Sequence, residues 1–251
     1  MLTAPVTGSR RGARTGQERE EGLVRPTLLL AVHGTRDPDG LDVTRALARG
    51  VRERAGVPVR LAFADVRDPD VGDVAATISG PIVVVPAFLA AGYHVRVDIP
   101  GQLARVGRFD ARITGALGGD PRLVAAAARR LREAGWRAPD AVVLAAAGSS
   151  DPGALAEVAD AAGRLAETLG SPVRTGYIAT GTPTVAQTVA ALRAEGHRRV
   201  AIASWLLAPG LFHQRLAGAG ADLVAGPLCP DSGVAAAVVA RYREAVAPAR
   251  V

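Results

Sequence analysis

The segments LLLAVHGTRDPDG (residues 28–40) and VVLAAAGSSDPGA (residues 142–154) decide how this chain of 251 residues folds. Each is an apolar run followed by a glycine and then by Asp-Pro, and the two align at an offset of 114 residues. A short apolar run before such a turn predicts a buried strand, and an Asp ahead of a helical pattern is a favoured N-cap. The same strand-to-helix unit therefore occurs twice.

The repeat continues beyond these segments. Residues 57–69 align with residues 171–183 at the same offset, and residues 86–94 align with residues 204–212 at an offset of 118. A repeat of this length indicates a duplicated domain rather than the short period of a solenoid.

Strand-like runs rich in Leu and β-branched residues alternate with helical stretches rich in Ala, Arg and Glu, which is typical of βα units around a parallel sheet. The expected strands are 27–32, 58–64, 81–86, 111–116, 141–146, 172–178, 198–204 and 221–225. The clearest expected helices are 120–134, 151–169 and 231–246. We therefore expect an α/β fold with two similar doubly wound parallel-sheet domains that pack as an internal pseudo-dimer.

The predicted organisation is a disordered head at residues 1–25, a domain at 26–137 that carries the active site, and a degenerate copy at 138–251. The head lacks the apolar region of a signal peptide, and no uncharged apolar run reaches the roughly 18 residues of a membrane span. We therefore expect a soluble, cytoplasmic protein.

The composition excludes several chemistries. Cys229 is the single cysteine, so this chain alone forms no intrachain disulfide, cysteine zinc site or iron–sulfur cluster. All 30 basic residues are Arg, and without Lys there is no Walker A lysine or pyridoxal Schiff base. The net charge of +6 leaves nucleic-acid binding as one interpretation, but an aromatic content of 4% argues against a surface that stacks bases.

The two copies differ at three ionisable positions, which are present only in the first. The aligned pairs are His33 with Ala147, Asp65 with Ala179 and His94 with Phe212. A lone histidine beside an apolar strand is ordinarily part of the core. Three coincident differences favour a site instead, since each residue follows one of the first three strands and ligands of open α/β sheets bind at the strands' carboxyl ends.

Two imidazoles and a carboxylate, with no sulfur ligand, suit a divalent ion such as Fe, Co, Ni or Zn. Imidazole titrates near neutrality, so one histidine can take up a proton while the other holds a metal ion. The pattern therefore indicates chemistry in which a metal ion and protons exchange.

The motifs LLLAVHGTRDP, AFADVRDP and PAFLAAGYHVRVDIP resemble the sirohydrochlorin chelatases of the ATP-independent class II, in the duplicated long form related to CbiX. The resemblance covers residues 27–247, and the third motif is the most specific. In the family the first motif usually has Ser where Thr35 stands, and a Glu commonly stands at the position of Asp65.

The resemblance implies a lyase that inserts Fe²⁺ or Co²⁺ into sirohydrochlorin, for sirohaem or cobalamin-type biosynthesis, with no cofactor beyond the substrate metal and no ATP. It implies that His33 is the proton acceptor and a metal ligand, that Asp65 assists it catalytically, and that His94 is the second metal ligand. The loop implied to cradle the macrocycle consists of Leu89, Ala90, Ala91, Gly92, Tyr93 and His94.

Sirohydrochlorin carries eight carboxylates, and Arg36, Arg67 and Arg96 near the motifs would attract such a polyanion. For each of them a solvated surface charge remains the simpler interpretation. The second half is expected to complete the cleft as a partner subunit would, which gives a monomer that binds one macrocycle. We expect neither a nucleic acid nor a membrane as partner.

A second class of function stays open, namely a carrier that binds a tetrapyrrole or a metal ion without catalysing insertion. The departure at Asp65 keeps it open. His197 and His213 are expected to have no part in metal insertion, and GALGGDP (115–121) is interpreted as a strand-to-helix turn beside the cleft.

Overall fold

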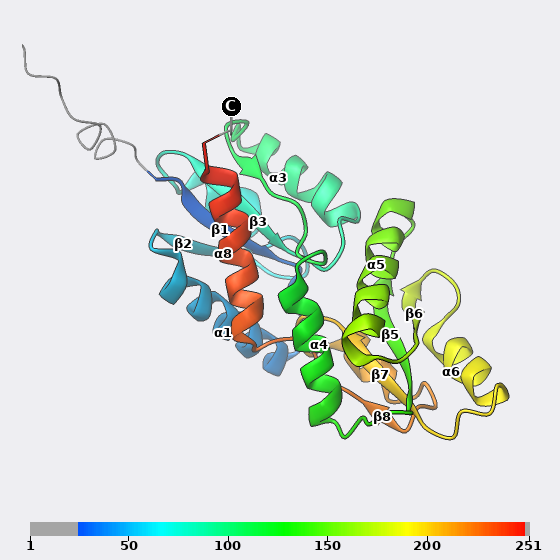
Figure 1. Cartoon of the computed structure of the whole chain (residues 1–251). Coiled ribbons are helices and arrows are strands. Elements are labelled where there is room, and N and C mark those ends of the chain that lie inside the picture. The colour runs from blue at the N-terminus through cyan, green and yellow to red at the C-terminus, as the bar shows by residue number, and fades with distance from the viewer. Residues whose placement is uncertain (1–24, 249–251) are drawn as a thin grey trace, which may run out of the picture.

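The computed structural model describes residues 25–248, so the head expected at residues 1–25 lies outside it except for Arg25. It contains two four-stranded parallel sheets (Figure 1). The first sheet has the order β2-β1-β3-β4, built from β1 (Thr27–Val32), β2 (Val59–Phe63), β3 (Ile82–Ala87) and β4 (Arg112–Ile113). The second has the order β6-β5-β7-β8, built from β5 (Ala141–Gly148), β6 (Val173–Thr180), β7 (Val200–Trp205) and β8 (Leu223–Val224). The α/β fold class is confirmed.

Helices connect successive strands, as parallel pairing requires. They are α1 (Pro38–Ala55), α2 (Val71–Ala76), the π-helical turn η2 (His94–Asp98), α3 (Ile99–Arg105), α4 (Pro121–Glu133), α5 (Pro152–Leu169), α6 (Val185–Ala194), α7 (Leu211–Leu216) and α8 (Ser232–Val246). The four longest begin after aspartates whose carboxylates accept backbone N–H groups, namely Asp37, Asp120, Asp151 and Asp231. Each cap of this kind stabilises its helix by roughly 0.5–2 kcal/mol.

The outer strands β4 and β8 are two residues long, shorter than the predicted 111–116 and 221–225. Each is an edge strand with a single neighbour, and the glycine-containing segment that follows leaves the sheet. The two strands predicted from the apolar residues of these stretches are therefore too long.

Successive residues of a central strand point to opposite faces of the sheet and pack into two different hydrophobic cores. In β1, Leu28 and Leu30 point into a large central core shared by both halves, whereas Leu29 and Ala31 point into a smaller outer core. The central core lies between the two sheets and is filled by α1, α8, α4 and α5, while α2 and α3 cover the outer face of the first sheet (Figure 1).

The two halves exchange their last helices. Helix α4 follows β4 of the first half but packs on β7 and α5 of the second, and α8 follows β8 but packs on β3 and α1 (Figure 1). Polar contacts support the exchange: the Tyr242 hydroxyl donates to the Pro26 carbonyl at 2.6 Å, and Arg243 donates to the Arg54 carbonyl at 3.2 Å. Each sheet is thus completed by a helix from the other half, and the division of the chain at residues 137 and 138 stays a prediction.

Within residues 25–248, no helix combines the length and the apolarity that crossing a bilayer requires.

Candidate active site

The structure brings His33, Asp65 and His94 together. One ligand atom from each lies within 4.8 Å of those of the other two, and no other group of three His, Cys, Asp or Glu residues in the described part of the chain is as close. His33 follows β1 directly, Asp65 lies two residues after β2, and His94 begins η2 after the loop that leaves β3. Ligand bonds of about 2 Å would let one divalent ion draw these atoms together with small side-chain movements.

Gly34 allows the first two motifs to touch. The backbone N–H of Asp65 donates to the His33 carbonyl at 3.1 Å. Gly34 has a φ of +95°, and a Cβ there would lie 2.5 Å from the Asp65 carbonyl oxygen. Any larger residue would push the two segments apart, so the glycine after His33 is a requirement of the close approach.

Asp65 lies in a strained turn. Val66 has a φ of +69°, a region that β-branched residues rarely adopt, and the Arg67 N–H donates to the Asp65 carbonyl at 2.8 Å across it. The Val66 N–H also donates to the Asp65 carboxylate at 2.7 Å. Such strain costs on the order of 1–3 kcal/mol and is found where a side chain is held for function.

The two imidazoles contact each other edge to face. The ring centroids of His33 and His94 are 4.6 Å apart with an interplanar angle of 83°. Phe88 lies beside both, at 6.2 Å from His33 and 6.0 Å from His94. The aromatic ring limits the orientations available to the histidines, while His33 itself stays exposed to solvent.

Asp98 contacts the far nitrogen of His94 and was not predicted from the sequence. The Nδ1 of His94 lies 2.6 Å from Oδ2 of Asp98, and both side chains are about two-thirds buried. A carboxylate in this position fixes the ring and the tautomer of a metal-binding histidine, leaving Nε2 for the metal. The i, i+4 spacing of His94 and Asp98 was the available signal.

The loop from Leu89 to Tyr93 rests on the turn at residues 115–121. The Leu117 N–H donates to the Phe88 carbonyl at 2.7 Å, and a Cβ on Gly118 would lie 1.9 Å from the Leu89 carbonyl oxygen. The expectation that this turn lies beside the cleft agrees with these contacts.

Exposed apolar side chains lie close in sequence to the residues of the cluster. Tyr93 is 65% exposed, Val97 is 49% exposed and Val66 is 37% exposed, and they adjoin His94 and Asp65 along the chain. These three make up half of the large hydrophobic residues exposed between residues 25 and 248. Exposed apolar side chains beside polar groups are typical of a ligand-binding surface.

Two of the three candidate arginines make structural contacts. The Arg67 side chain donates to the Thr35 carbonyl, which joins the first two motifs. Arg96 Nε lies 3.1 Å from the carboxylate of Asp151. Arg36 is exposed, and no hydrogen bond or ion pair of its side chain occurs within residues 25–248.

The second half has no matching cluster among its residues up to 248. His213 lies in α7 with its Nε2 3.3 Å from the Ala225 carbonyl oxygen, and His197 is exposed in the turn after α6. The positions that match His33 and Asp65 carry Ala147 and Ala179.

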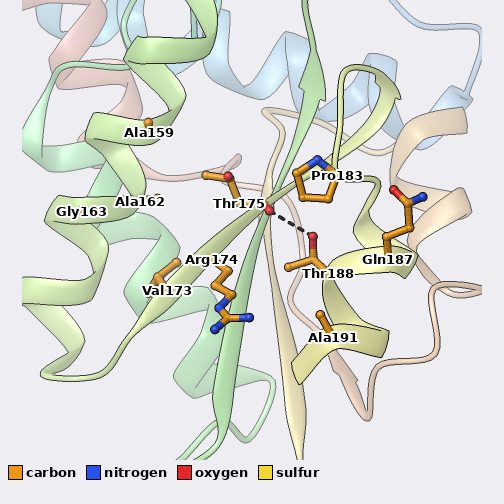
Figure 2. A pocket seen from close by; sticks show the side chains of 10 residues that line it. All are labelled: Ala159, Ala162, Gly163, Val173, Arg174, Thr175, Pro183, Gln187, Thr188 and Ala191. Carbon is orange, nitrogen blue, oxygen red and sulfur yellow. Dashed lines mark hydrogen bonds between the residues drawn. The ribbon is translucent and has the colours of Figure 1, made fainter. Parts of the chain in front are cut away.

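Figure 2 shows a groove of about 540 Å³ in the second half, over β6 and between α5 and α6. Arg174 is the one charged residue that lines it and forms an ion pair with Glu195 at 2.7 Å. The Thr188 hydroxyl on its wall donates to the Thr175 carbonyl at 3.1 Å (Figure 2). The groove holds no candidate metal ligand or proton acceptor and lies apart from the histidine cluster.

Comparison with known proteins gives relatives for both halves. The sirohydrochlorin ferrochelatase of Bacillus subtilis (strain 168) is 30% identical over 154 residues, which span 57% of this chain and 59% of that protein. The sirohydrochlorin cobaltochelatase of Methanothermobacter thermautotrophicus is 36% identical over 77 residues, which span 29% of this chain and 54% of that protein. The matched parts thus cover less than two-thirds of either relative.

The structure of SirB from Bacillus subtilis with Fe3+ has the same fold, with a TM-score of 0.75 and 23% identity over 89% of this chain and 96% of that one. The CbiX family model matches twice, at residues 27–134 and 141–245, which are the two copies of the internal repeat. With most of its length matched in this way, the chain belongs to the CbiX family.

Proposed function

We propose that this chain is a sirohydrochlorin chelatase that inserts Fe²⁺ or Co²⁺ into the macrocycle without ATP, in sirohaem or cobalamin-type biosynthesis. The observation that carries the proposal is the grouping of His33, Asp65 and His94 within 4.8 Å at the carboxyl end of the first sheet. Family membership and relatives named as sirohydrochlorin ferrochelatase and cobaltochelatase support the choice of substrate.

Metal insertion requires the macrocycle to lose two pyrrole N–H protons. A neutral His33 accepts a proton from the ring, and Asp65 beside it passes protons on to water, which its exposure permits. The reaction exchanges two protons for one divalent cation, so no phosphoryl group has to be consumed. The absence of Lys agrees with chemistry that binds no nucleotide.

His33 and His94 hold the incoming ion before it reaches the ring. Imidazole nitrogens suit divalent Fe and Co, and the contact from Asp98 leaves Nε2 of His94 available. The flat macrocycle lies against the backbone of the loop at Leu89–Tyr93, where Ala90, Ala91 and Gly92 present no bulk. The exposed ring of Tyr93 and the exposed methyl groups of Val66 and Val97 border it.

The proposal includes one macrocycle per chain and a monomer whose second half takes the place of a partner subunit. The absence of ionisable groups at the matching positions of the second half supports a single site. Action in the cytoplasm, without a nucleic-acid or membrane partner, stays a prediction.

An absorbance time course tests the proposal. Sirohydrochlorin is mixed with Co²⁺ or Fe²⁺, with and without protein, and the spectral change on insertion is followed under anaerobic conditions. A rate that rises in proportion to enzyme concentration, with many turnovers per chain, is the expected result. Tight binding of the macrocycle without acceleration would instead identify a carrier.

A further inference from the structure

Both backbone polar groups of Ala91, in the loop Leu89–Tyr93, are held by hydrogen bonds to side chains. Its N–H donates to Oε2 of Glu157 at 3.0 Å, and Glu157 belongs to α5 of the second half. Its carbonyl accepts from Nε of Arg96 at 2.7 Å, and the same guanidinium pairs with Asp151, the N-cap of α5, at 3.1 Å. The loop of the first half is therefore tied to the second half at two carboxylates.

The internal repeat allows a comparison within the molecule. At a second interface between the halves, the loop comes from the second half and the helix N-terminus comes from the first half. There Asp37, which matches Asp151, accepts from the side chain of Gln214, which matches Arg96, at 3.0 Å. The N-cap contact across the interface is thus present on both sides of the molecule. It is a feature of how the halves pack rather than of the site.

The hydrogen bond between Glu157 and the Ala91 N–H is present at only one of the two interfaces. Its counterpart on α1 is Val43, and the counterpart of Ala91 is Pro209, which has no N–H to donate. Both members of the contact are therefore present beside the histidine cluster and both are lost at the opposite interface. This is the same asymmetry that His33, Asp65 and His94 show.

We propose that Glu157 is a positioning residue of the active site, contributed by the otherwise degenerate second half. The inference rests on the proposed function. Ala91 lies three residues before His94, and the intervening Gly92 carbonyl accepts from the N–H groups of both Val95 and Arg96 at 3.1 and 3.0 Å. Holding the backbone of Ala91 therefore holds the start of the turn that carries His94, and it holds the loop surface against which the macrocycle lies.

The role requires an acceptor at Glu157 but no proton transfer. Glu157→Gln keeps an oxygen that can accept from the Ala91 N–H, whereas Glu157→Ala and Glu157→Met remove it. A hydrogen bond from a backbone N–H to a carboxylate is stronger than a neutral one, and its loss is expected to raise the KM for sirohydrochlorin about 10-fold, with a smaller effect on kcat.

The test compares the full-length wild-type protein with these three variants and with Gln214→Ala, which breaks the N-cap contact with Asp37 at the opposite interface. Insertion of Co²⁺ into sirohydrochlorin gives kcat, KM and the pH profile for each protein. Hydrogen exchange measured by mass spectrometry reports on the segments 89–96 and 207–214 without requiring activity, and thermal melting verifies folding.

In Glu157→Ala and Glu157→Met we expect faster hydrogen exchange at residues 89–96 and a raised KM for sirohydrochlorin. Glu157→Gln should recover most of the activity. Gln214→Ala should have the wild-type KM and the wild-type exchange rate at residues 89–96. Wild-type kinetics in the folded Ala and Met variants would overturn the inference. A Gln variant as impaired as Ala, with a shifted pH profile, would overturn it too, since Glu157 would then transfer protons. A wild-type protein that shows no insertion would refute the proposed function, while the exchange data would still test the contact.

Discussion

Asp98 lies one helical turn after His94, and its carboxylate contacts the imidazole Nδ1 at 2.6 Å. The pair connects the side of the imidazole that faces away from the metal position to the start of α3, because Asp98 is the residue that precedes Ile99 at the first turn of that helix. Ile99 is fully buried in the outer core of the first half. The orientation of one candidate metal ligand is thus fixed by a helix that is itself anchored in the core.

Asp98→Ala should weaken Co²⁺ binding by about 10- to 100-fold, the usual effect of removing the carboxylate behind a metal-binding histidine. Calorimetric titration of the protein with Co²⁺, without tetrapyrrole, measures this directly. Asp42→Ala is the matched control, since Asp42 is an exposed aspartate that pairs with Arg45 on the surface of α1. Equal affinity in the two variants would show that Asp98 does not orient a ligand.

His33→Ala should lower the insertion rate by about 100-fold or more, because it removes both a metal ligand and the proton acceptor. Steady-state absorbance assays measure the effect. His197→Ala and His213→Ala serve as controls, and both should insert metal at the wild-type rate. A His33 variant that retains this rate would exclude the residue from the mechanism.

Asp65→Asn should reduce the rate far more than Asp65→Glu, because passing on protons requires a carboxylate while one added methylene changes only its reach. Thermal melts accompany the rate measurements, since Val66 beside it is already strained. If Asn supported full activity, Asp65 would be a turn residue and the site would consist of two histidines.

Titration of the protein with sirohydrochlorin should saturate at one macrocycle per chain, because the second half carries alanines at the positions of His33 and Asp65. Fluorescence quenching or absorbance at protein concentrations well above the Kd gives the stoichiometry. Two equivalent sites would show that the matching surface of the second half also binds the ligand.

Cys229 should react with Ellman's reagent only when the protein unfolds. The side chain is 4% exposed, and burial raises the pKa of its thiol to about 12, so the reactive thiolate is scarce at pH 8. Because the pKa is raised in the folded state, ionisation favours the unfolded chain as the pH rises from about 8.5 towards 12, and stability should fall over that range. Rapid labelling of the native protein at pH 8 would contradict this.

The strands and the grouping of His33, Asp65 and His94 could be predicted because both follow from local patterns and one rule of topology. Buried parallel strands read as continuous apolar runs, and residues that follow such strands meet at one edge of a sheet. Comparing the two copies added the information that these three residues differ where the framework does not. The roles assigned to them stay predictions.

Asp98, Glu157 and the helix exchange were missed for different physical reasons. The contact of Asp98 depends on η2 being helical, and the sequence predicts a loop that ends at His94 without predicting a helical turn over His94–Asp98. Glu157 lies 63 residues beyond His94 and reaches the loop only through the packing of α5 against the first half. The exchange of α4 and α8 cannot be predicted from the hydrophobic periodicity of the sequence, because an amphipathic helix has the same pattern whichever sheet it covers.

The exchange of α4 and α8 also constrains how the molecule can move. Many two-domain α/β proteins open and close around a ligand by bending at a few linker residues. Here such bending would pull each of these helices off the sheet that it covers and expose the central core to water. The packing therefore opposes a change in the angle between the two halves, and we expect any change in access to the exposed histidine cluster to come from movement of the loops around it.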